Sequence, residues 1–336
     1  MIEQNTDFFA YVDNFAEKSK VDSICIFDNC SEVPSVTIGI PTYKRVLTLK
    51  DTIESALAQE CEFEYKILVL DNNPVRDDET EQFMREYADN LAVSYYKNSE
   101  NLGMGGNWNR IFTIIESEWI VLLHDDDLIA PSFLKDMLKV AEKYDADVVN
   151  SAFIFWLQKE SDCPSFFFKQ KEYDVIKSSL GANFFYNRAG MPTGILYRRE
   201  VYLKEGGVND EYYPAQDWVS NSLLSYKYNY LIYTKPLTIY RYAVNTYMKK
   251  ETTEAYMPII YIFMHYIGKL LNFPKWFVNM YTCMEVGVGV SRLDENSFHM
   301  YGKDFKPQGY FMRVVRKIIF KLFQVYYDKR NYIGSV

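Results

Sequence analysis

The sequence lacks most of the features that mark a secreted, membrane-spanning or nucleic-acid-binding protein. Its five cysteines are odd in number, scattered and without the spacing of a metal site, which favours a reducing compartment. The opening residues, MIEQNTDFFAYVDNF, are acidic and contain no long apolar run, unlike a secretory signal. The net charge of −8 argues against nucleic acid as a partner.

Long hydrophobic runs and histidines are also scarce. The longest apolar stretch, Tyr256 to Phe273, is interrupted by Pro258, His265 and Lys269 and makes a poor membrane span. We therefore expect a cytoplasmic protein, with any membrane contact peripheral and on the inner face. His265 and His299 have no companion at ligand spacing, so we expect both to be structural or exposed.

Aromatic residues, in contrast, are abundant at 17% of the chain, and most are Tyr and Phe. A tyrosine ring stacks on a flat partner while its hydroxyl forms a hydrogen bond, which suits carbohydrate or protein surfaces. The alternative is that these rings only fill the core and the surface. The aromatic C-terminal half is also a candidate surface for a homodimer.

Short apolar runs alternate with helical patterns from about residue 35 to residue 155, which predicts an α/β fold. Strands that are apolar throughout favour a mainly parallel sheet with helices on both faces. The expected strands are Val36–Ile40, Tyr65–Leu70, Ala92–Tyr96, Trp119–Leu123, Val148–Phe155, Gly194–Tyr197, Tyr230–Tyr233 and Leu237–Tyr242. The expected helices are Leu47–Gln59, Glu79–Ala88, Trp108–Ile115 and Ser132–Lys143, followed by about three helical segments after Glu251. We expect Ser161–Ile176 to form a long loop over the substrate.

Polar clusters follow four of these strands. They are PTYKR (41–45), DNN (71–73), NSENLGMGGNWNR (98–110) and HDDD (124–127). Ligands of open α/β sheets bind beyond the carboxyl ends of the strands, so the clusters should meet at one edge. The adjacent carboxylates of Asp125, Asp126 and Asp127 repel one another, and Mg²⁺ or Mn²⁺ would remove the conflict and leave room for a diphosphate. The alternative is that Asp126 and Asp127 only cap a turn.

These four segments, in this order, resemble the family 2 glycosyltransferases, which have the GT-A fold and use nucleotide sugars. The match covers roughly Ser35 to Tyr242 and rests on VTIGIPTYKR, ILVLDNN, NLGMGGNWN and LLHDDDLIAPSFL. One departure is His124, which stands where the commonest family string, Asp-x-Asp-Asp, has its first Asp. An Asp-x-Asp alignment over 125–127 avoids this but shifts the register, and Asp127 ends the motif either way.

The resemblance implies roles for the matching residues. Those implied at the nucleotide or its diphosphate are Pro41, Thr42, Tyr43, Arg45, Asp71, Asn73, Asn107, Arg110, Asp125, Asp126 and Arg241. Asp71 would accept a hydrogen bond from the base. Asp127 would bind the metal, and Asp125 or Asp126 would contact the ribose or complete the metal shell. Arg241 would steady the diphosphate through its guanidinium group, although a surface ion pair is an equal alternative.

Asp217, in YYPAQDWVSNSLL, is the candidate catalytic base. The family commonly has Glu-Asp at this place and uses the second acid as the base. Here the pair is Gln216-Asp217, so only that second acid remains. The structural alternative is a helix N-cap. Met191, Pro192 and Trp218 would shape the acceptor site.

The resemblance implies inverting transfer from a nucleotide-diphosphate sugar, best guessed as a UDP-sugar, to a glycan or lipid-linked glycan in bacterial surface polysaccharide synthesis. It also implies an N-terminal extension (1–34), a catalytic domain (35–245, with a nucleotide half at 35–130 and an acceptor half at 131–245) and a helical extension (246–336). The rivals are a non-catalytic sugar- or nucleotide-binding module of this fold and a sugar nucleotidyltransferase. The glycine-rich opening loop of a nucleotidyltransferase is absent, and Gly103, Gly105 and Gly106 fail the dinucleotide-binding spacing.

The segment FMRVVRKIIFKLFQVYYDKR, Phe311 to Arg330, carries six basic residues and one acid on a helical pattern. A basic amphipathic helix of this kind can lie in a membrane interface, so we expect membrane contact through residues 308–330. The alternative is a helix packed on the catalytic domain with its charges in water.

Overall fold

The computed structural model describes residues 2–29, 32–157, 162–189, 193–242, 250–293 and 296–336. Met191 and Pro192, expected near the acceptor, lie outside these residues. The described cysteines are free thiols. Within the described residues, no helix has both the length and the apolar character needed to cross a membrane.

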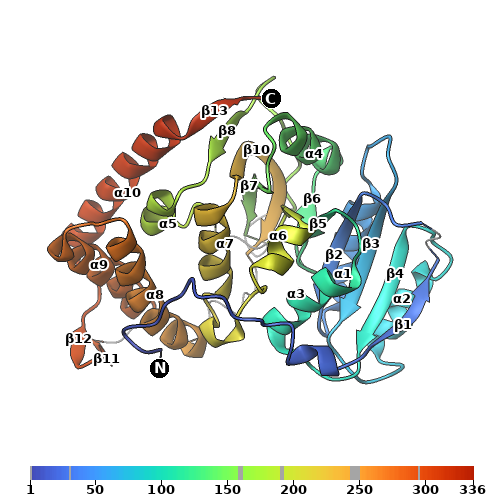
Figure 1. Ribbon diagram of the computed structural model, residues 1–336, viewed down its shortest axis with the longest axis horizontal. Helices are drawn as coiled ribbons and strands as arrows, with labels where there is room; N and C mark the ends of the chain where they lie inside the picture. Colours follow the sequence, from blue (N-terminus) through green and yellow to red (C-terminus); the bar gives the residue numbers. More distant parts are fainter. Residues whose placement is uncertain (1, 30–31, 158–161, 190–192, 243–249, 294–295) are drawn as a thin grey trace.

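A large twisted sheet organises the molecule, with helices packed around it and a helical C-terminal part beside it (Figure 1). Its strand order is β1-β4-β3-β2-β5-β9-β7-β10-β8-β13, with β6 paired to β10. The strands are β1 (Ser23–Asp28), β2 (Val36–Thr42), β3 (Tyr65–Asp71), β4 (Val93–Asn98), β5 (Trp119–Leu122), β6 (Leu128–Ile129), β7 (Val148–Trp156), β8 (Asp174–Lys177), β9 (Ile195–Arg198), β10 (Tyr230–Arg241) and β13 (Tyr332–Ser335). A separate hairpin pairs β11 (Phe298–Met300) with β12 (Lys303–Phe305).

The helices cover the sheet and build the C-terminal part. They are α1 (Val46–Leu57), α2 (Glu79–Met84), α3 (Gly103–Ile114), α4 (Phe133–Lys143), α5 (Leu180–Tyr186), α6 (Arg199–Lys204), α7 (Gln216–Lys227), α8 (Lys250–Leu270), α9 (Lys275–Leu293) and α10 (Tyr310–Arg330). The short 3₁₀ helices are η1 (Lys18–Lys20), η2 (Arg85–Tyr87) and η3 (Asp210–Tyr212). In α4 the apolar residues recur with helical spacing and are buried, while its lysines and its one glutamate are exposed, as its sequence predicts.

The expected α/β sheet flanked by helices, with a helical C-terminal part, is confirmed. Neighbouring strands among β4, β3, β2 and β5 are parallel, as are β7 and β10. β9 runs antiparallel between β5 and β7, and β1, β8 and β13, which lie at or next to the edges of the sheet, are antiparallel as well. The sequence did not predict these edge strands, because short, half-polar segments such as YIGS gain strand structure only from the sheet edge that they meet.

Three local expectations were wrong. The expected loop over Ser161–Ile176 ends early, because β8 begins at Asp174 and pairs with both β10 and β13. The two strands expected over 230–242 form one strand, β10, which passes Pro236 through register shifts against β7. Helix α3 begins at Gly103 rather than at Trp108, because Asp210 satisfies the amides of its glycine-rich first turn.

The N-terminal segment connects the helical part with the far end of the sheet (Figure 1). Phe8 is buried, with its ring centroid 5.0 Å from that of Phe263 on α8 and 4.9 Å from that of Tyr212. Further along, the Arg110 guanidinium on α3 donates to the carbonyl oxygens of Lys18 and Val21. The chain then enters β1, so residues before the expected catalytic domain brace both ends of the molecule.

Gly39, in the middle of β2, allows α3 to lie close to the sheet. A Cβ at this position would lie 2.4 Å from Cγ2 of Ile111 and 3.4 Å from Cδ1 of Ile115, both of which are buried. A side chain there would push α3 away from the strand. This matters for function because α3 also carries Trp108, which packs at the site described below.

Replacing Gly39 with alanine should destabilise the protein by about 1–3 kcal/mol, because the added methyl group overpacks the contact between β2 and α3. Urea unfolding monitored by tryptophan fluorescence measures this change. Gly309→Ala is the control, since a Cβ there meets nothing within 4 Å, and it should cost less than about 1 kcal/mol. Equal costs for the two variants would contradict the packing role of Gly39.

Candidate functional site

The register of the parallel strands brings the expected site residues level with one another. Thr42 pairs with Asp71 across β2 and β3, and Gly39 pairs with Leu122 across β2 and β5. Because Thr42 and Asp125 each lie three residues beyond that second pair, their side chains meet at the edge of the sheet. The Thr42 hydroxyl donates to Oδ2 of Asp125 at 2.7 Å.

Arg45 joins the same group from the loop after β2. Its Nη1 donates to Oδ2 of Asp126 at 2.6 Å and lies 3.4 Å from Oδ1 of Asp125. Pro41 is buried at the end of β2, and Tyr43 is exposed beside Arg45. The structure therefore brings together the expected loop of β2 and two of the three adjacent carboxylates of the HDDD segment.

A second group next to the first could hold a metal ion. His124, Asp126 and Asp127 each offer a ligand atom, and these atoms lie within 4.8 Å of one another. The Asp127 carboxylate is fully buried, and its Oδ1 accepts a hydrogen bond from the backbone amide of Arg241 at 2.8 Å. Its Oδ2 and the Nε2 of His124 are buried and have no hydrogen-bond partner within the described residues. Asp125, which was expected in the metal shell, lies outside this group and is held by Thr42 and Arg45.

Burial leaves the imidazole of His124 free to bind a cation, and it leaves the buried aspartates short of positive charge. It lowers the pKa of His124 to about 4, so the imidazole is neutral at pH 7 and keeps a free lone pair. It raises the pKa of Asp125 to about 6 and, together with the charge of Asp126, raises the pKa of Asp127 well above its usual value. Unpaired buried acceptors and mutually repelling carboxylates are costly without a positive partner. The donor set therefore fits a divalent ion.

His124 is a site residue that the sequence did not assign to the metal. Its ring stacks on Trp108 of α3, with ring centroids 5.3 Å apart and planes 23° from parallel. Its backbone amide donates to Oγ1 of Thr193. The signal in the sequence was its position directly before the three aspartates, where the family usually has an acid.

Asp71, expected to contact the base, is engaged within the chain. Its Oδ2 accepts from Lys97 Nζ at 2.7 Å and from the Tyr95 hydroxyl at 2.8 Å. Its Oδ1 accepts from the backbone amide of Asn73 at 2.9 Å. Burial raises the pKa of Asp71, and the hydrogen bond from Lys97 opposes that rise. Lys97 also donates to Asp78 at 2.9 Å. This buried network shapes the end of β3, and a contact between Asp71 and a base stays a prediction.

Asn73 and Asn107 lie near this network, whereas Arg110 does not. The Asn73 side chain donates to Asp78. Asn107 is buried, accepts from Asn98 at 2.8 Å and donates to the Leu70 carbonyl at 3.3 Å. The guanidinium of Arg110 instead holds the N-terminal segment, as described above, so the structure does not bring it to the strand ends.

Glycines at the start of α3 accommodate Asp210, which the sequence analysis missed. The Asp210 carboxylate accepts from the amides of Gly105 at 2.9 Å and Gly106 at 3.2 Å. A Cβ on Gly105 would lie 2.3 Å from Oδ1 of Asp210. The helix N-terminus, an anion-binding feature, is therefore already occupied by a carboxylate of the same chain.

Arg241, expected at the diphosphate, is buried next to the metal-type group. Its backbone amide fixes Asp127, and its Nη2 pairs with Oδ2 of Asp51 at 2.9 Å. Its guanidinium carbon lies 4.5 Å from the ring centroid of Trp156, and its buried Nε has no hydrogen-bond partner among the described residues. The sequence left two roles open for Arg241, a contact to the diphosphate or an ion pair. The structure shows an ion pair with Asp51 and also places Arg241 beside Asp127.

Asp217 lies in the first turn of α7, one residue after the helix begins at Gln216. The N-cap is Ala215, so the capping alternative is not what the structure shows. Burial raises the pKa of Asp217 to about 7. The neighbouring Gln216 places Nε2 3.4 Å from the Met104 sulfur on α3, and Trp108, one turn further along α3, stacks on His124. The start of α7 thus lies on the same side of α3 as the aspartates.

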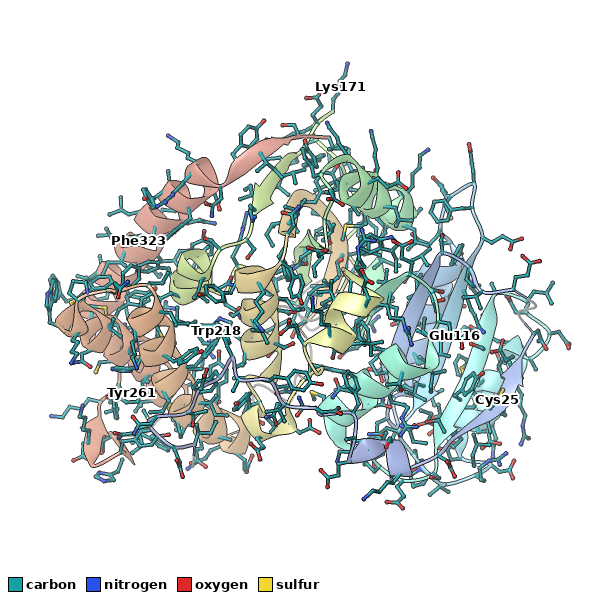
Figure 2. All side chains as sticks on the ribbon, in the orientation of Figure 1. Cys25, Glu116, Lys171, Trp218, Tyr261 and Phe323 are labelled. Atoms are coloured by element: carbon teal, nitrogen blue, oxygen red, sulfur yellow. The ribbon has the colours of Figure 1, made fainter. Side chains whose placement is uncertain are left out.

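Trp218 turns away from this start and packs on α8. Its ring centroid is 5.3 Å from that of Phe263, with the rings nearly perpendicular. Trp218 is labelled in Figure 2. Its side chain is buried, so it serves packing between α7 and α8, while its Nε1 has no hydrogen-bond partner within the described residues.

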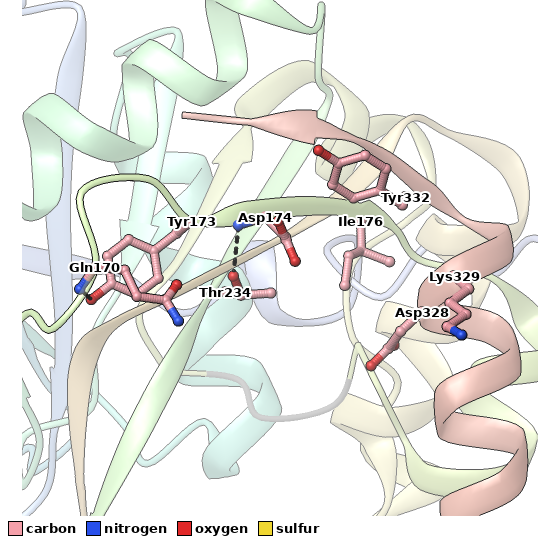
Figure 3. Close-up of a pocket in the computed structure, with 8 residues that line it drawn as sticks. All are labelled: Gln170, Tyr173, Asp174, Ile176, Thr234, Asp328, Lys329 and Tyr332. Carbon is pink, nitrogen blue, oxygen red and sulfur yellow. Dashed lines mark hydrogen bonds between the residues drawn. The ribbon is translucent and has the colours of Figure 1, made fainter.

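An open pocket of about 490 Å³ lies elsewhere, between β8, β10 and the end of the chain (Figure 3). Its lining residues are Gln170, Tyr173, Asp174, Ile176, Thr234, Asp328, Lys329 and Tyr332. None of the residues expected at the nucleotide, the metal or the base is among them. The pocket is therefore separate from the group at the strand ends.

Comparisons with known proteins agree with this architecture. Residues 37–204, half of the chain, match the family described as "Glycosyl transferase family 2". The chain belongs to glycosyl transferase family 2.

Relatives of this family 2 glycosyltransferase come from several organisms. The uncharacterized protein MT1568 of Mycobacterium tuberculosis is 26% identical over 201 residues, which cover 55% of this chain and 60% of that protein. The uncharacterized glycosyltransferase MJ1057 of Methanocaldococcus jannaschii is 31% identical over 111 residues, which cover 32% and 38%. The chain thus matches less than two thirds of the length of either relative. An uncharacterized glycosyltransferase of Haemophilus influenzae is 23% identical over 241 residues, covering 69% of this chain and 77% of the relative.

Solved structures share the fold. TarS (residues 1–349) from S. aureus, in complex with UDP, superposes with a TM-score of 0.51 at 16% identity and covers 77% of this chain and 81% of its own. The mannosyltransferase PcManGT from Pyrobaculum calidifontis, in complex with GDP-Man and Mn²⁺, gives a TM-score of 0.50 at 15% identity and covers 83% and 78%. The fold of this family 2 glycosyltransferase therefore resembles the GT-A enzymes.

Replacing Lys97 with methionine should destabilise the protein by about 3–5 kcal/mol, because it leaves the buried carboxylate of Asp71 without its cation. Chemical unfolding at pH 7 measures the loss. Lys50→Met is the matched control, since the pair that Lys50 forms with Glu54 is exposed and should contribute less than about 1 kcal/mol. Similar stability of the two variants would show that Asp71 does not depend on Lys97.

Proposed function

We propose that this family 2 glycosyltransferase moves a sugar from a nucleotide-diphosphate sugar to an acceptor hydroxyl, with inversion at the anomeric carbon. One observation carries the proposal. Buried and partly buried acids at the end of β5 form two adjoining groups, one held by Thr42 and Arg45 and one with unpaired acceptor atoms on His124 and Asp127. The first group suits a ribose and the second a cation beside a diphosphate.

The donor that we propose is a UDP-sugar. Support comes from TarS, whose structures contain UDP and UDP-GlcNAc, while PcManGT binds GDP-Man and makes guanine nucleotides the competing class. Thr42, Tyr43 and Arg45 would contact the nucleoside, and Asp125 would face the ribose. In this proposal, residues 35–130 form the nucleotide half and residues 131–245 the acceptor half.

The residues present fit a divalent cation, which we propose to be Mn²⁺ or Mg²⁺. Asp127, His124 and Asp126 would hold it, and a single imidazole beside two carboxylates favours Mn²⁺ over Mg²⁺. A bound cation would offset negative charge on the leaving diphosphate. The Mn²⁺ in the PcManGT complex supports this choice. Arg241, fixed beside Asp127, would add positive charge on the same side.

Asp217 would act as the general base. An acceptor oxygen attacks the anomeric carbon while the bond from that carbon to the diphosphate oxygen breaks, and the hydroxyl proton passes to the Asp217 carboxylate. Its raised pKa makes it a better proton acceptor at neutral pH than an exposed aspartate. We propose a glycan or lipid-linked glycan as the acceptor, with bacterial surface polysaccharide synthesis as the setting.

Nucleoside diphosphates should stabilise the protein, and Mn²⁺ should strengthen the effect. A ligand at a hundredfold excess over its Kd adds about 2.7 kcal/mol, which raises Tm by several degrees. Thermal shift with UDP, GDP, UDP-sugars and GDP-mannose, each with and without Mn²⁺, measures this and separates the donor classes. Asp127→Asn should lose the metal-dependent part, whereas the exposed Asp89→Asn should behave as wild type. An unchanged metal response in Asp127→Asn would place the cation elsewhere.

Replacing Asp217 with asparagine should leave nucleotide binding intact and reduce transfer by about 10²–10⁴-fold, because the acceptor proton then has no base. The carboxylate must be ionised to accept a proton, so wild-type kcat/KM should rise with pH through about 7 and level off above it. Release of nucleoside diphosphate, followed by an assay with the donor that the thermal shift identifies, measures both effects. Glu211→Gln, an exposed carboxylate nearby, is the control.

The rival functions give different results in the same assays. A non-catalytic module would bind the nucleotide sugar but release no nucleoside diphosphate. A sugar nucleotidyltransferase would instead consume a nucleoside triphosphate and a sugar phosphate and release pyrophosphate. Full transfer activity in Asp217→Asn would remove the base assignment while leaving the donor site in place.

A further inference from the structure

Helix α10 carries an apolar stripe that faces away from the protein. Phe311, Val314, Ile318, Leu322 and Val325 recur at spacings of three and four residues, which places them on one side of a helix. The exposed fractions are 74% for Phe311, 54% for Ile318 and 65% for Leu322. Exposed hydrophobic residues are common singly, but a continuous row of this length marks an interaction surface.

Helix α10 is packed on the rest of the protein, so a detached helix does not account for the exposure of the stripe. A second face of α10, formed by Val315, Ile319, Phe323 and Tyr327, packs on the core of the helical part. Phe323 on α10 stacks on Phe185 of α5 with ring centroids 3.7 Å apart, and Phe323 is marked in Figure 2.

Polar contacts and the chain end fix α10 as well. Arg316 pairs with Glu285 of α9 through two hydrogen bonds of 2.6 and 2.9 Å. Beyond the helix, β13 pairs with β8 at the sheet edge (Figure 3). One apolar face is therefore already used in folding, and the stripe is a second, outward face on a fixed helix.

A row of cations runs beside the stripe. Arg313, Lys317 and Lys321 follow one another at four-residue spacing, and the whole helix has six basic residues and one acid, Asp328. The protein as a whole carries a net charge of −8, so positive charge is concentrated where the apolar stripe is exposed. A surface that combines the two requires a partner that is both apolar and negatively charged.

An anionic bilayer meets both requirements. Apolar side chains of an interfacial helix insert at the boundary between headgroups and acyl chains, while lysines and arginines at its side meet the lipid phosphates. A second copy of the chain fits less well, because two α10 helices face to face would bring their basic rows together.

We propose that the outer face of α10 is a docking surface for a bilayer containing anionic phospholipid. The surface is defined by Phe311, Val314, Ile318, Leu322 and Val325, with Arg313, Lys317 and Lys321 as its basic side. The protein would lie on the membrane along α10 without spanning it. This proposal does not depend on the transfer reaction, although a lipid-linked acceptor would then share a surface with the enzyme.

Co-sedimentation with vesicles tests the proposal on the full chain. The wild type should bind vesicles of phosphatidylcholine and phosphatidylglycerol in equal parts, bind vesicles of phosphatidylcholine alone only weakly, and release from the anionic vesicles as salt is raised. Lys317→Glu with Lys321→Glu should weaken anionic binding by at least about 25-fold, since each basic residue near such a surface contributes about a factor of five and the new carboxylates add repulsion. Ile318→Glu with Leu322→Glu should abolish sedimentation with both kinds of vesicle.

The matched control is Val33→Glu with Leu91→Glu, which makes the same chemical change at two exposed apolar residues away from α10. It should bind anionic vesicles as the wild type does. All the changed side chains are exposed, so every variant should fold. Thermal unfolding checks this. Wild type that stays in the supernatant, or an Ile318/Leu322 variant that binds normally, would overturn the proposal. So would a wild-type dimer by light scattering that becomes a monomer in that variant, since the stripe would then belong to a second copy.

Discussion

Carboxylates held out of water at the end of β5 are the constraint around which this structure is arranged. Aspartate is rarely buried without a partner, because losing hydration of the charge costs several kcal/mol. Here the chain provides a partial solution: Thr42 and Arg45 hold Asp125, Arg45 also pairs with Asp126, and the Arg241 amide binds one oxygen of Asp127. The atoms of Asp127 and His124 that have no partner in the described part of the chain have the character of a ligand set.

Much of the surrounding scaffold serves to keep these groups in place. Gly39 lets α3 approach β2, and α3 then presents Trp108 to the imidazole of His124. The Asp210 carboxylate accepts a hydrogen bond from the first turn of α3. Arg110 of the same helix donates to the carbonyl of Val21 in the N-terminal segment, just before β1. Asp71 and Lys97 form a similar buried pair one strand away. The common principle is that a preorganised polar site needs rigid neighbours on every side.

The helical C-terminal part follows a different principle, in which one helix has two apolar faces. Packing explains the inner face of α10, because Phe323 and its neighbours close the core around α5, α8 and α9. Nothing in folding explains the outer face, whose apolar and basic rows are exposed together. The acids at the end of β5 are polar and buried, whereas the outer face of α10 is apolar and exposed, so the two features suit partners of different chemistry.

The sequence by itself determined the strands of the α/β half, the order of the polar segments and the family, because apolar periodicity and strand-end motifs are local properties of the chain. It also marked Asp127, Asp217 and the basic C-terminal helix as candidates. Tertiary structure decided what pattern could not: that β1 and β13 join the edges of the sheet, that Arg110 holds the N-terminal segment, and that His124 rather than Asp125 stands with Asp126 and Asp127. The physical reason is that edge pairing, burial and the choice of hydrogen-bond partner depend on residues far apart in the chain, which come together only when the molecule folds.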